Sequence, residues 1–294
     1  MTISLHLGAH RTGTTALQRL LQRHVDRLAT AGIGFLGPQT LRRADLTADR
    51  RAWTQARAAG QPVACAPLAA ECARLTAAGC NHIVISEENL VGTMGVNLAR
   101  AELYPNAQVR LADLATALPA APARIFLTVR DFAGYWRSAL AHALLAGGAT
   151  AFDAERFSRS RGNAWTPLLR AIRSAFPDSR LLVARHTVHR DFIPALAAEI
   201  IGPDTLAGVS RPWTTVNAAL PADAIEMLRA MPEGPERTRL AEAVRREGRA
   251  PIDPFSPAQR AVLEARFARE WAALVSGAEP GVEIMTLVKT ESTG

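Results

Sequence analysis

"HLGAHRTGTT", residues 6–15, joins a short apolar segment to a long amphipathic one. Residues 3–8 predict a strand, and residues 13–32 carry leucines at helical spacing and end in a glycine, so they predict a helix. A glycine-rich turn between a strand and a helix brings backbone N–H groups and the positive end of the helix together. The stretch therefore predicts an anion-binding loop. The alternative is a glycine turn that serves packing alone.

The loop has the glycine spacing of a nucleoside-triphosphate site but lacks its lysine. Thr14 stands where a lysine would reach the β- and γ-phosphates, ahead of the hydroxyl residue Thr15. The chain has almost no lysine, and Lys289 is the only one, so simple replacement would have left arginine at position 14. The cation lies earlier in the loop, at Arg11. This arrangement argues against a triphosphate and favours another anion.

Strand and helix patterns alternate along the rest of the 294 residues. Further strands are predicted at residues 33–37, 83–85, 125–129 and 180–185, and late helices at residues 220–231 and 256–277. Residues 40–80 predict a helical insertion, residues 186–277 a mostly helical segment, and the tail after residue 277 fits neither pattern clearly. Short apolar strands separated by helices indicate a three-layer α/β/α fold with a central parallel sheet, here in a single domain of residues 1–294.

Charge and cysteine content restrict the partners and the compartment. The net charge of +7 suggests an anionic partner: nucleic acid, a membrane surface or a polyanionic small molecule. The N-terminus has no signal-peptide pattern and no stretch approaches the roughly 20 apolar residues of a membrane span, so we expect a cytoplasmic protein without a membrane span. Cys65, Cys72 and Cys80 form no CxxC pair, which predicts buried free thiols.

Two segments together resemble a known enzyme family. "GAHRTGTT" resembles the 5′-phosphosulfate loop of sulfotransferases that use 3′-phosphoadenosine 5′-phosphosulfate (PAPS), in which Lys or Arg precedes Ser/Thr-Gly-Thr-Thr. "IFLTVRDFAGYWRSAL" resembles their second element, an apolar strand that ends in arginine with a serine eight residues later, here Arg130 and Ser138. Segment 165–187 resembles the family's helix-then-strand segment, and segments 211–231 and 256–275 resemble the Asn-containing and late helical segments of bacterial members. The resemblance implies a sulfotransferase fold of the P-loop NTPase type.

The resemblance also implies an activity. A sulfuryl group would pass from PAPS to a hydroxyl or amine of a small-molecule, carbohydrate or lipid acceptor, leaving adenosine 3′,5′-bisphosphate (PAP), with no metal expected. Arg130 and Ser138 would bind the 3′-phosphate through bidentate and hydroxyl contacts. Arg11 would stabilise the charge that grows on the leaving phosphate. The residues that would hold the 5′-phosphosulfate are His10, Arg11, Thr12, Gly13, Thr14 and Thr15.

The catalytic base has several candidates. In the family a His or Glu near the end of a central strand takes this role, and "ISEENL" offers Glu87 and Glu88. We favour Glu88 for its Glu-Asn-Leu setting, and Glu87 is second. Alternatively, Ser86 is a helix N-cap and both acids only face the helix dipole. His142, His186 and His189 are further possible bases with a structural role as the alternative. His10 either contacts the ligands or only its neighbours, and Tyr135 and Trp136 line the cleft or belong to the core.

Two other classes of function compete with this interpretation. A small-molecule kinase or NTPase would use "IVISEE" as the acidic strand of its magnesium site, and Thr14 is the main objection to it. A basic nucleic-acid-binding protein fits the net charge, but the arginines are scattered among acids and no nucleic-acid-binding motif is present. A sulfotransferase-like protein that binds PAPS without turnover is a third possibility.

Overall fold

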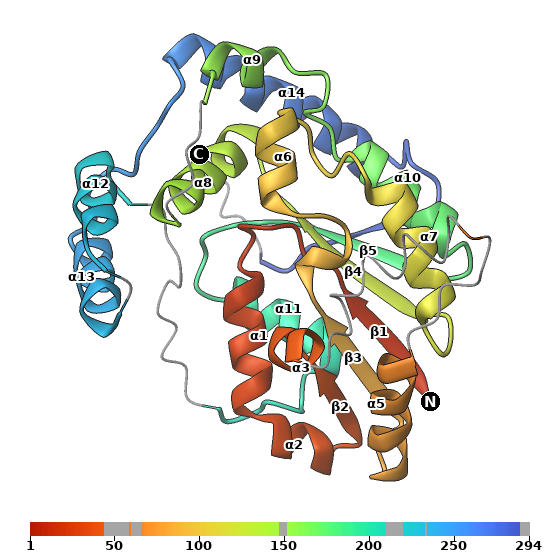
Figure 1. Ribbon diagram of the computed structural model, residues 1–294. Helices are drawn as coiled ribbons and strands as arrows, with labels where there is room; N and C mark the ends of the chain where they lie inside the picture. Colours follow the sequence, from red (N-terminus) through yellow and green to blue (C-terminus); the bar gives the residue numbers. More distant parts are fainter. Residues whose placement is uncertain (44–58, 60–65, 147–151, 210–219, 233, 289–294) are drawn as a thin grey trace.

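A single parallel sheet organises the computed structural model, which describes residues 1–43, 59, 66–146, 152–209, 220–232 and 234–288 (Figure 1). The strand order is β2-β3-β1-β4-β5-β6, and every neighbouring pair is parallel. The strands are β1 (Thr2–His6), β2 (Ile33–Leu36), β3 (His82–Ser86), β4 (Arg124–Val129), β5 (Arg180–Arg185) and β6 (Val282–Met285). The predicted α/β class with a central parallel sheet is confirmed.

Helices cover both faces of this sheet (Figure 1). Helices α1, α2 and α11 pack on one face, and α6, α7, α8, α10 and α14 pack on the other, where the larger core lies. The helical elements are α1 (Thr14–Arg23), α2 (Val25–Thr30), α3 (Pro38–Arg43), α5 (Ala66–Ala77), the 3₁₀ turn η1 (Glu88–Leu90), α6 (Met94–Arg100), α7 (Ala107–Ala117), α8 (Phe132–Leu145), α9 (Ala154–Arg159), α10 (Thr166–Ala175), α11 (Phe192–Ile201), α12 (Ala222–Ala230), α13 (Pro235–Arg246) and α14 (Pro257–Val275).

The connections reverse direction at the centre of the sheet. After β1 the chain turns toward β2 on one side, whereas after β4 it turns toward β5 on the other. In open parallel sheets, ligands bind outside the carboxyl ends of the strands at such a switch point. The topology therefore favours a ligand site formed by the loops that follow β1 and β4.

The central strand β1 is apolar on one face and polar on the other. Ile3 and Leu5 belong to the larger core, while the alternate residues Ser4 and His6 are buried on the α1 side. A buried polar group must find partners, and the Nδ1 atom of His6 lies 2.8 Å from the Oγ atom of Ser86 on β3. Burial lowers the pKa of His6 to about 4, so the imidazole is neutral at pH 7. This polar layer lies directly below the glycine loop.

Several element boundaries differ from the sequence prediction. The helix predicted over residues 13–32 is divided at His24, whose φ of −115° and ψ of 24° are not helical. The tail that fitted no pattern forms β6, parallel to β5. The late helix α14 begins as predicted, with Ser256 as its N-cap and Gln259 completing a capping box.

Other predictions are tested in part. The insertion is helical at α3 and α5, and its residues 44–58 and 60–65 lie outside the described part of the chain. Cys72 and Cys80 are buried, as predicted, while Cys65 falls in that same gap. No helix within the described ranges is both long and apolar enough to span a bilayer. The extent of the domain over residues 1–294 stays a prediction.

Candidate functional site

The loops after β1 and β4 meet at the switch point. The Nη1 atom of Arg130 donates a hydrogen bond of 2.8 Å to the backbone oxygen of Arg11. The Nε atom of Arg11 in turn donates one of 2.8 Å to the Oγ atom of Ser138 on α8. Three residues predicted from two separate patterns therefore lie in one hydrogen-bonded group, although 119 and 127 positions separate Arg11 from the other two.

The loop backbone is held in a conformation that favours glycine. Gly8 and Gly13 have φ values of 38° and 89°, and Arg11, with a φ of 67°, adopts the same left-handed region without being glycine. A Cβ atom on Gly8 would lie 2.5 Å from the Oγ1 atom of Thr14, and one on Gly13 would lie 2.7 Å from the Cδ1 atom of Ile193 on α11. Close packing as well as backbone geometry thus favours glycine at position 8. At position 13 the near atom is the flexible end of a side chain, so the backbone geometry decides. Arg11 is a strained residue of the kind found at ligand sites.

Four consecutive backbone amides of the loop are available to a ligand. The N–H groups of Thr12, Gly13, Thr14 and Thr15 have no hydrogen-bond partner among the residues that the structure describes. Gly13 is the N-cap of α1 and offers no side-chain cap. Unpartnered amides at a helix N-terminus, with the helix dipole behind them, favour an anion.

The three threonines of the loop differ in what their hydroxyls can do. Thr12 donates to the backbone oxygen of Ala9 at 2.6 Å, and Thr14 donates to the same oxygen at 3.3 Å. Both side chains are buried. The half-buried Thr15 makes no such bond within the described residues. Thr12 and Thr14 therefore shape the loop, whereas the hydroxyl of Thr15 is available.

Arg130 is a partly desolvated guanidinium. Its side chain is 16% exposed, burial lowers its pKa, and its Nε atom has no hydrogen-bond partner in the described part of the structure. The nearest carboxylate, Asp131, is 3.9 Å from Nε and caps α8 by accepting from Gly134. The indole N–H of Trp165 donates to the backbone oxygen of Arg130 at 2.9 Å. The backbone of Arg130 is thus fixed, and its Nε atom is a buried donor without a partner among the described residues. A guanidinium is the side-chain group that suits a phosphate.

The two adjacent glutamates have different environments. Glu87 is fully buried, and Arg42 on α3 donates two hydrogen bonds of 2.9 Å each to its carboxylate. Glu87 also accepts from the backbone and side-chain nitrogens of Asn89 at 3.0 and 2.8 Å. It is the N-cap of η1, so the alternative that Ser86 is the cap is wrong: Ser86 ends β3 and contacts His6 instead. The carboxylate of Glu87 is thus committed to structural hydrogen bonds.

Glu88 is the accessible carboxylate of the pair. Its side chain is 15% exposed and lies 3.5 Å from Arg42, and the Nε2 atom of Gln18 on α1 donates to it at 2.9 Å. Burial and the neighbouring Glu87 raise its pKa above the usual glutamate value. A raised pKa makes a carboxylate a stronger base at neutral pH.

The histidines named from the sequence lie in different settings. Burial lowers the pKa of His10 to about 4 and that of His186, assisted by Arg130, to about 3. Burial also lowers the pKa of His142, which lies within electrostatic reach of His10 and Arg11. The exposed His189 lies 3.8 Å from Asp191. The lowered pKa values make the imidazoles of His10, His142 and His186 mostly neutral near pH 7.

Tyr135 and Trp136 belong to the core. Both side chains are fully buried, and their rings meet edge to face with centroids 4.9 Å apart. They therefore do not line an open cleft.

Sequence reasoning missed several residues around the loop, namely Gln18, Arg42, Asn89 and Tyr104. Gln18 carried a usable signal, since it is a polar residue on the apolar, buried stripe of α1. Arg42 and Tyr104 carried none, because they reach the site from 45 and 94 positions away along the chain.

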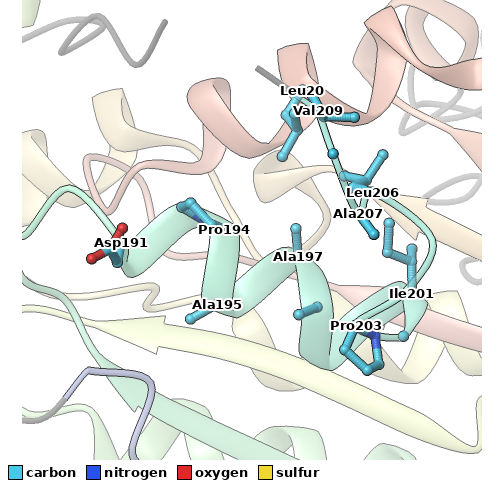
Figure 2. A pocket seen from close by; sticks show the side chains of 13 residues that line it. Leu20, Asp191, Pro194, Ala195, Ala197, Ile201, Pro203, Leu206, Ala207 and Val209 are labelled. Carbon is cyan, nitrogen blue, oxygen red and sulfur yellow. The ribbon is translucent and has the colours of Figure 1, made fainter. Parts of the chain in front are cut away.

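A separate groove of about 400 Å³ lies on the α1/α11 side, lined by α11, the loop after it and Leu20 of α1 (Figure 2). Asp191 is the charged residue in its lining, and none of the predicted site residues contributes to it. The groove is therefore not part of the loop site.

Comparison of the chain with protein-family models, curated proteins and solved structures gave no match. Within the described ranges, no three His, Cys, Asp or Glu side chains are grouped as metal ligands would be.

Proposed function

We propose that this protein transfers a sulfuryl group from PAPS to a hydroxyl or amine of an acceptor. The observation that carries the proposal is the contact of the two predicted donor elements: Arg11 reaches Ser138, and Arg130 reaches the backbone of Arg11. A donor with phosphate groups at both the 3′ and 5′ positions needs two anion sites a few ångströms apart. One hydrogen-bonded group at the switch point offers both.

In this proposal the donor is divided between the two elements. The unpartnered amides of Thr12 to Thr15 and the positive end of α1 favour the 5′-phosphosulfate. The partly exposed guanidinium of Arg130 and the hydroxyl of Ser138 favour the 3′-phosphate. Ser138 must then exchange its bond to Arg11 for one to the ligand, and Arg11 is released toward the 5′ side.

The reaction requires one bond exchange and one proton transfer. The acceptor oxygen or nitrogen attacks sulfur, the bond from sulfur to the bridging 5′-phosphate oxygen breaks, and PAP leaves. Arg11 stabilises the negative charge that grows on the bridging oxygen. Glu88 takes the acceptor proton, and Glu87 with Arg42 anchors the turn that carries Glu88.

Isothermal titration with PAP and adenosine 5′-monophosphate tests the donor site. We expect Arg130→Ala to weaken PAP binding far more than adenosine 5′-monophosphate binding, because only PAP carries the 3′-phosphate. Arg170→Ala is the matched control, since it removes the same charge from an exposed pair with Glu279. Equal losses for both nucleotides in Arg130→Ala would remove the 3′-phosphate role of Arg130.

Transfer of labelled sulfate from PAPS across a panel of alcohols, sugars, lipids and amines tests the activity itself. We expect turnover with at least one acceptor class. PAP binding without turnover on any acceptor would indicate a protein that only binds the donor. A magnesium-dependent thermal shift with ATP and none with PAP would replace the proposal with a kinase or NTPase. Steep salt-dependent binding to nucleic acid without nucleotide binding would favour the nucleic-acid-binding protein.

A further inference from the structure

The chain contains two tyrosines, and both are buried beside the predicted donor loop. Tyr104 lies in the connection between α6 and α7 with a left-handed φ of 49°, and Tyr135 lies on α8. Asn97 ties the two together: its Oδ1 atom accepts from the backbone N–H of Tyr104 at 3.1 Å, and its Nδ2 atom donates to the hydroxyl of Tyr135 at 2.7 Å. Tyr104 is thus fixed in an unusual backbone conformation.

The hydroxyl of Tyr104 contacts the loop twice through His10. It accepts from the backbone N–H of His10 at 2.8 Å and lies 2.9 Å from the Nδ1 atom of the same residue. The two rings stack with centroids 5.8 Å apart. His10 directly precedes Arg11, so these contacts hold the loop immediately before its strained residue.

The surrounding bonds settle which imidazole nitrogen carries the proton. The amide nitrogen of Asn89 donates to Glu87, so its Oδ1 atom faces the Nε2 atom of His10 as an acceptor, at 3.3 Å. Nε2 must therefore carry the hydrogen, and Nδ1 has the lone pair that accepts from Tyr104. Because burial lowers the pKa of His10 to about 4, this neutral tautomer persists at pH 7.

We propose that Tyr104 is a positioning residue for the donor loop. Its hydroxyl occupies the amide of His10 and orients the ring, so the turn places Arg11 in its left-handed conformation with the side chain toward Ser138. The next four amides are then left for the anion. This role rests on the proposed function, because the loop it holds is the one assigned to the 5′-phosphosulfate.

Tyr104→Phe removes the hydroxyl and keeps the ring, and Tyr135→Phe is the matched control. Both variants delete one buried tyrosine hydroxyl from the same network, in which the two hydroxyls also interact with each other, but only the Tyr104 hydroxyl bonds to His10 of the loop. For Tyr104→Phe we expect PAP binding about tenfold weaker, the effect of losing one to two buried hydrogen bonds. For Tyr135→Phe we expect PAP affinity within about twofold of the parent, with comparable loss of stability.

Imidazole nitrogen NMR gives a readout that a general loss of stability would not move. In the parent protein we expect His10 as the Nε2–H tautomer, titrating near pH 4. In Tyr104→Phe the Nδ1 lone pair loses its donor, so the pKa of His10 rises. The charged groups around His10, namely Glu87, Arg11 and Arg42, and the neighbouring His142 are unchanged in both variants.

The outcomes separate the two proposals. A raised His10 pKa with weakened PAP binding in Tyr104→Phe alone supports the positioning role. Equal losses of PAP affinity in both tyrosine variants, or an unchanged His10, would overturn it even if the parent binds PAP well. If the parent protein binds no PAP, the proposed function fails and the donor role of Tyr104 fails with it. If the pKa of His10 still rises in Tyr104→Phe in that case, the result supports the Tyr104–His10 hydrogen bond but no role in donor binding.

Discussion

Gly8→Ala tests whether the loop is as closely packed as the contacts indicate. The glycine has a φ of 38°, and an added Cβ atom would lie 2.5 Å from the Oγ1 atom of Thr14 and 3.0 Å from the Cε1 atom of His6. Both neighbours are buried, and Thr14 opens helix α1. Thr14 must therefore shift to accept the methyl group.

The expected loss of stability has two parts. A left-handed φ costs an alanine roughly 1–2 kcal/mol. Overpacking against buried neighbours adds roughly 1–3 kcal/mol. We therefore expect Gly8→Ala to lower the free energy of unfolding by about 3 kcal/mol. Displacing Thr14 also distorts the amides after it, so PAP binding weakens as well.

Two other glycines separate these parts. Gly79 has a φ of 92° with no heavy atom within 4 Å of an added Cβ, so Gly79→Ala isolates the backbone cost of about 1 kcal/mol. Gly95 lies in helix α6 with the same open space, so Gly95→Ala stabilises by about 0.5–1 kcal/mol. Urea denaturation of the three variants against the parent measures all three values.

A double variant tests directly whether Thr14 causes the clash at position 8. Thr14→Ala removes the nearest clashing atom, so Gly8→Ala combined with it should lose less stability than the sum of the single variants, by about 1 kcal/mol. If Gly8→Ala costs no more than Gly79→Ala, or if the double variant is additive, the loop relaxes around the methyl group and the packing argument is wrong.

Three further predictions concern the carboxylates and the buried imidazole. Glu88→Gln should preserve PAP affinity, measured by titration calorimetry, and sharply reduce sulfate transfer; unchanged turnover would exclude this carboxylate as the base. Arg42→Ala leaves Glu87 buried without its cation and should destabilise the protein by about 3 kcal/mol in urea denaturation, against at most about 0.5 kcal/mol for the surface pair removed by Arg74→Ala. His6 has a folded pKa of about 4, below its unfolded value, so its contribution to stability is complete above pH 6.5 and is lost as the pH falls toward 4, by up to about 1.4 kcal/mol per pH unit. Denaturation at pH 7, 6 and 5 should show this fall in the free energy of unfolding. His6→Gln should lower the slope of the free energy against pH by up to about 1.4 kcal/mol per pH unit, the effect of one proton.

The sheet was largely predictable because its signals are local. Each strand from β1 to β5 is a short apolar run bounded by turn residues, and those runs lie within a few residues of the observed bounds. The failures were also local. Nothing in the sequence around His24 marks a break, since leucine and valine spacing continues across it.

The site was predictable only where a pattern is carried by neighbours in the chain. Arg11 and the pair Arg130 and Ser138 follow from motif spacing, and their meeting follows from the topology. Tyr104 reaches His10 from a left-handed turn between two helices. No residue near Tyr104 in the sequence indicates that its side chain points toward the loop. The different environments of Glu87 and Glu88 likewise depend on Arg42, which arrives from another helix.

The position of β1 in the middle of the sheet affects how the chain folds during synthesis. Its first partner strand is β3, about 80 residues later in the sequence, and its other partner β4 comes later still. At about 5–20 residues per second, the ribosome leaves β1 unpaired for roughly 4–16 s. An all-apolar strand would be prone to aggregate over that interval, but Ser4 and His6 make one side of β1 polar. The same side chains that form a buried polar layer in the folded protein thus make the unpaired strand β1 less prone to aggregate during synthesis.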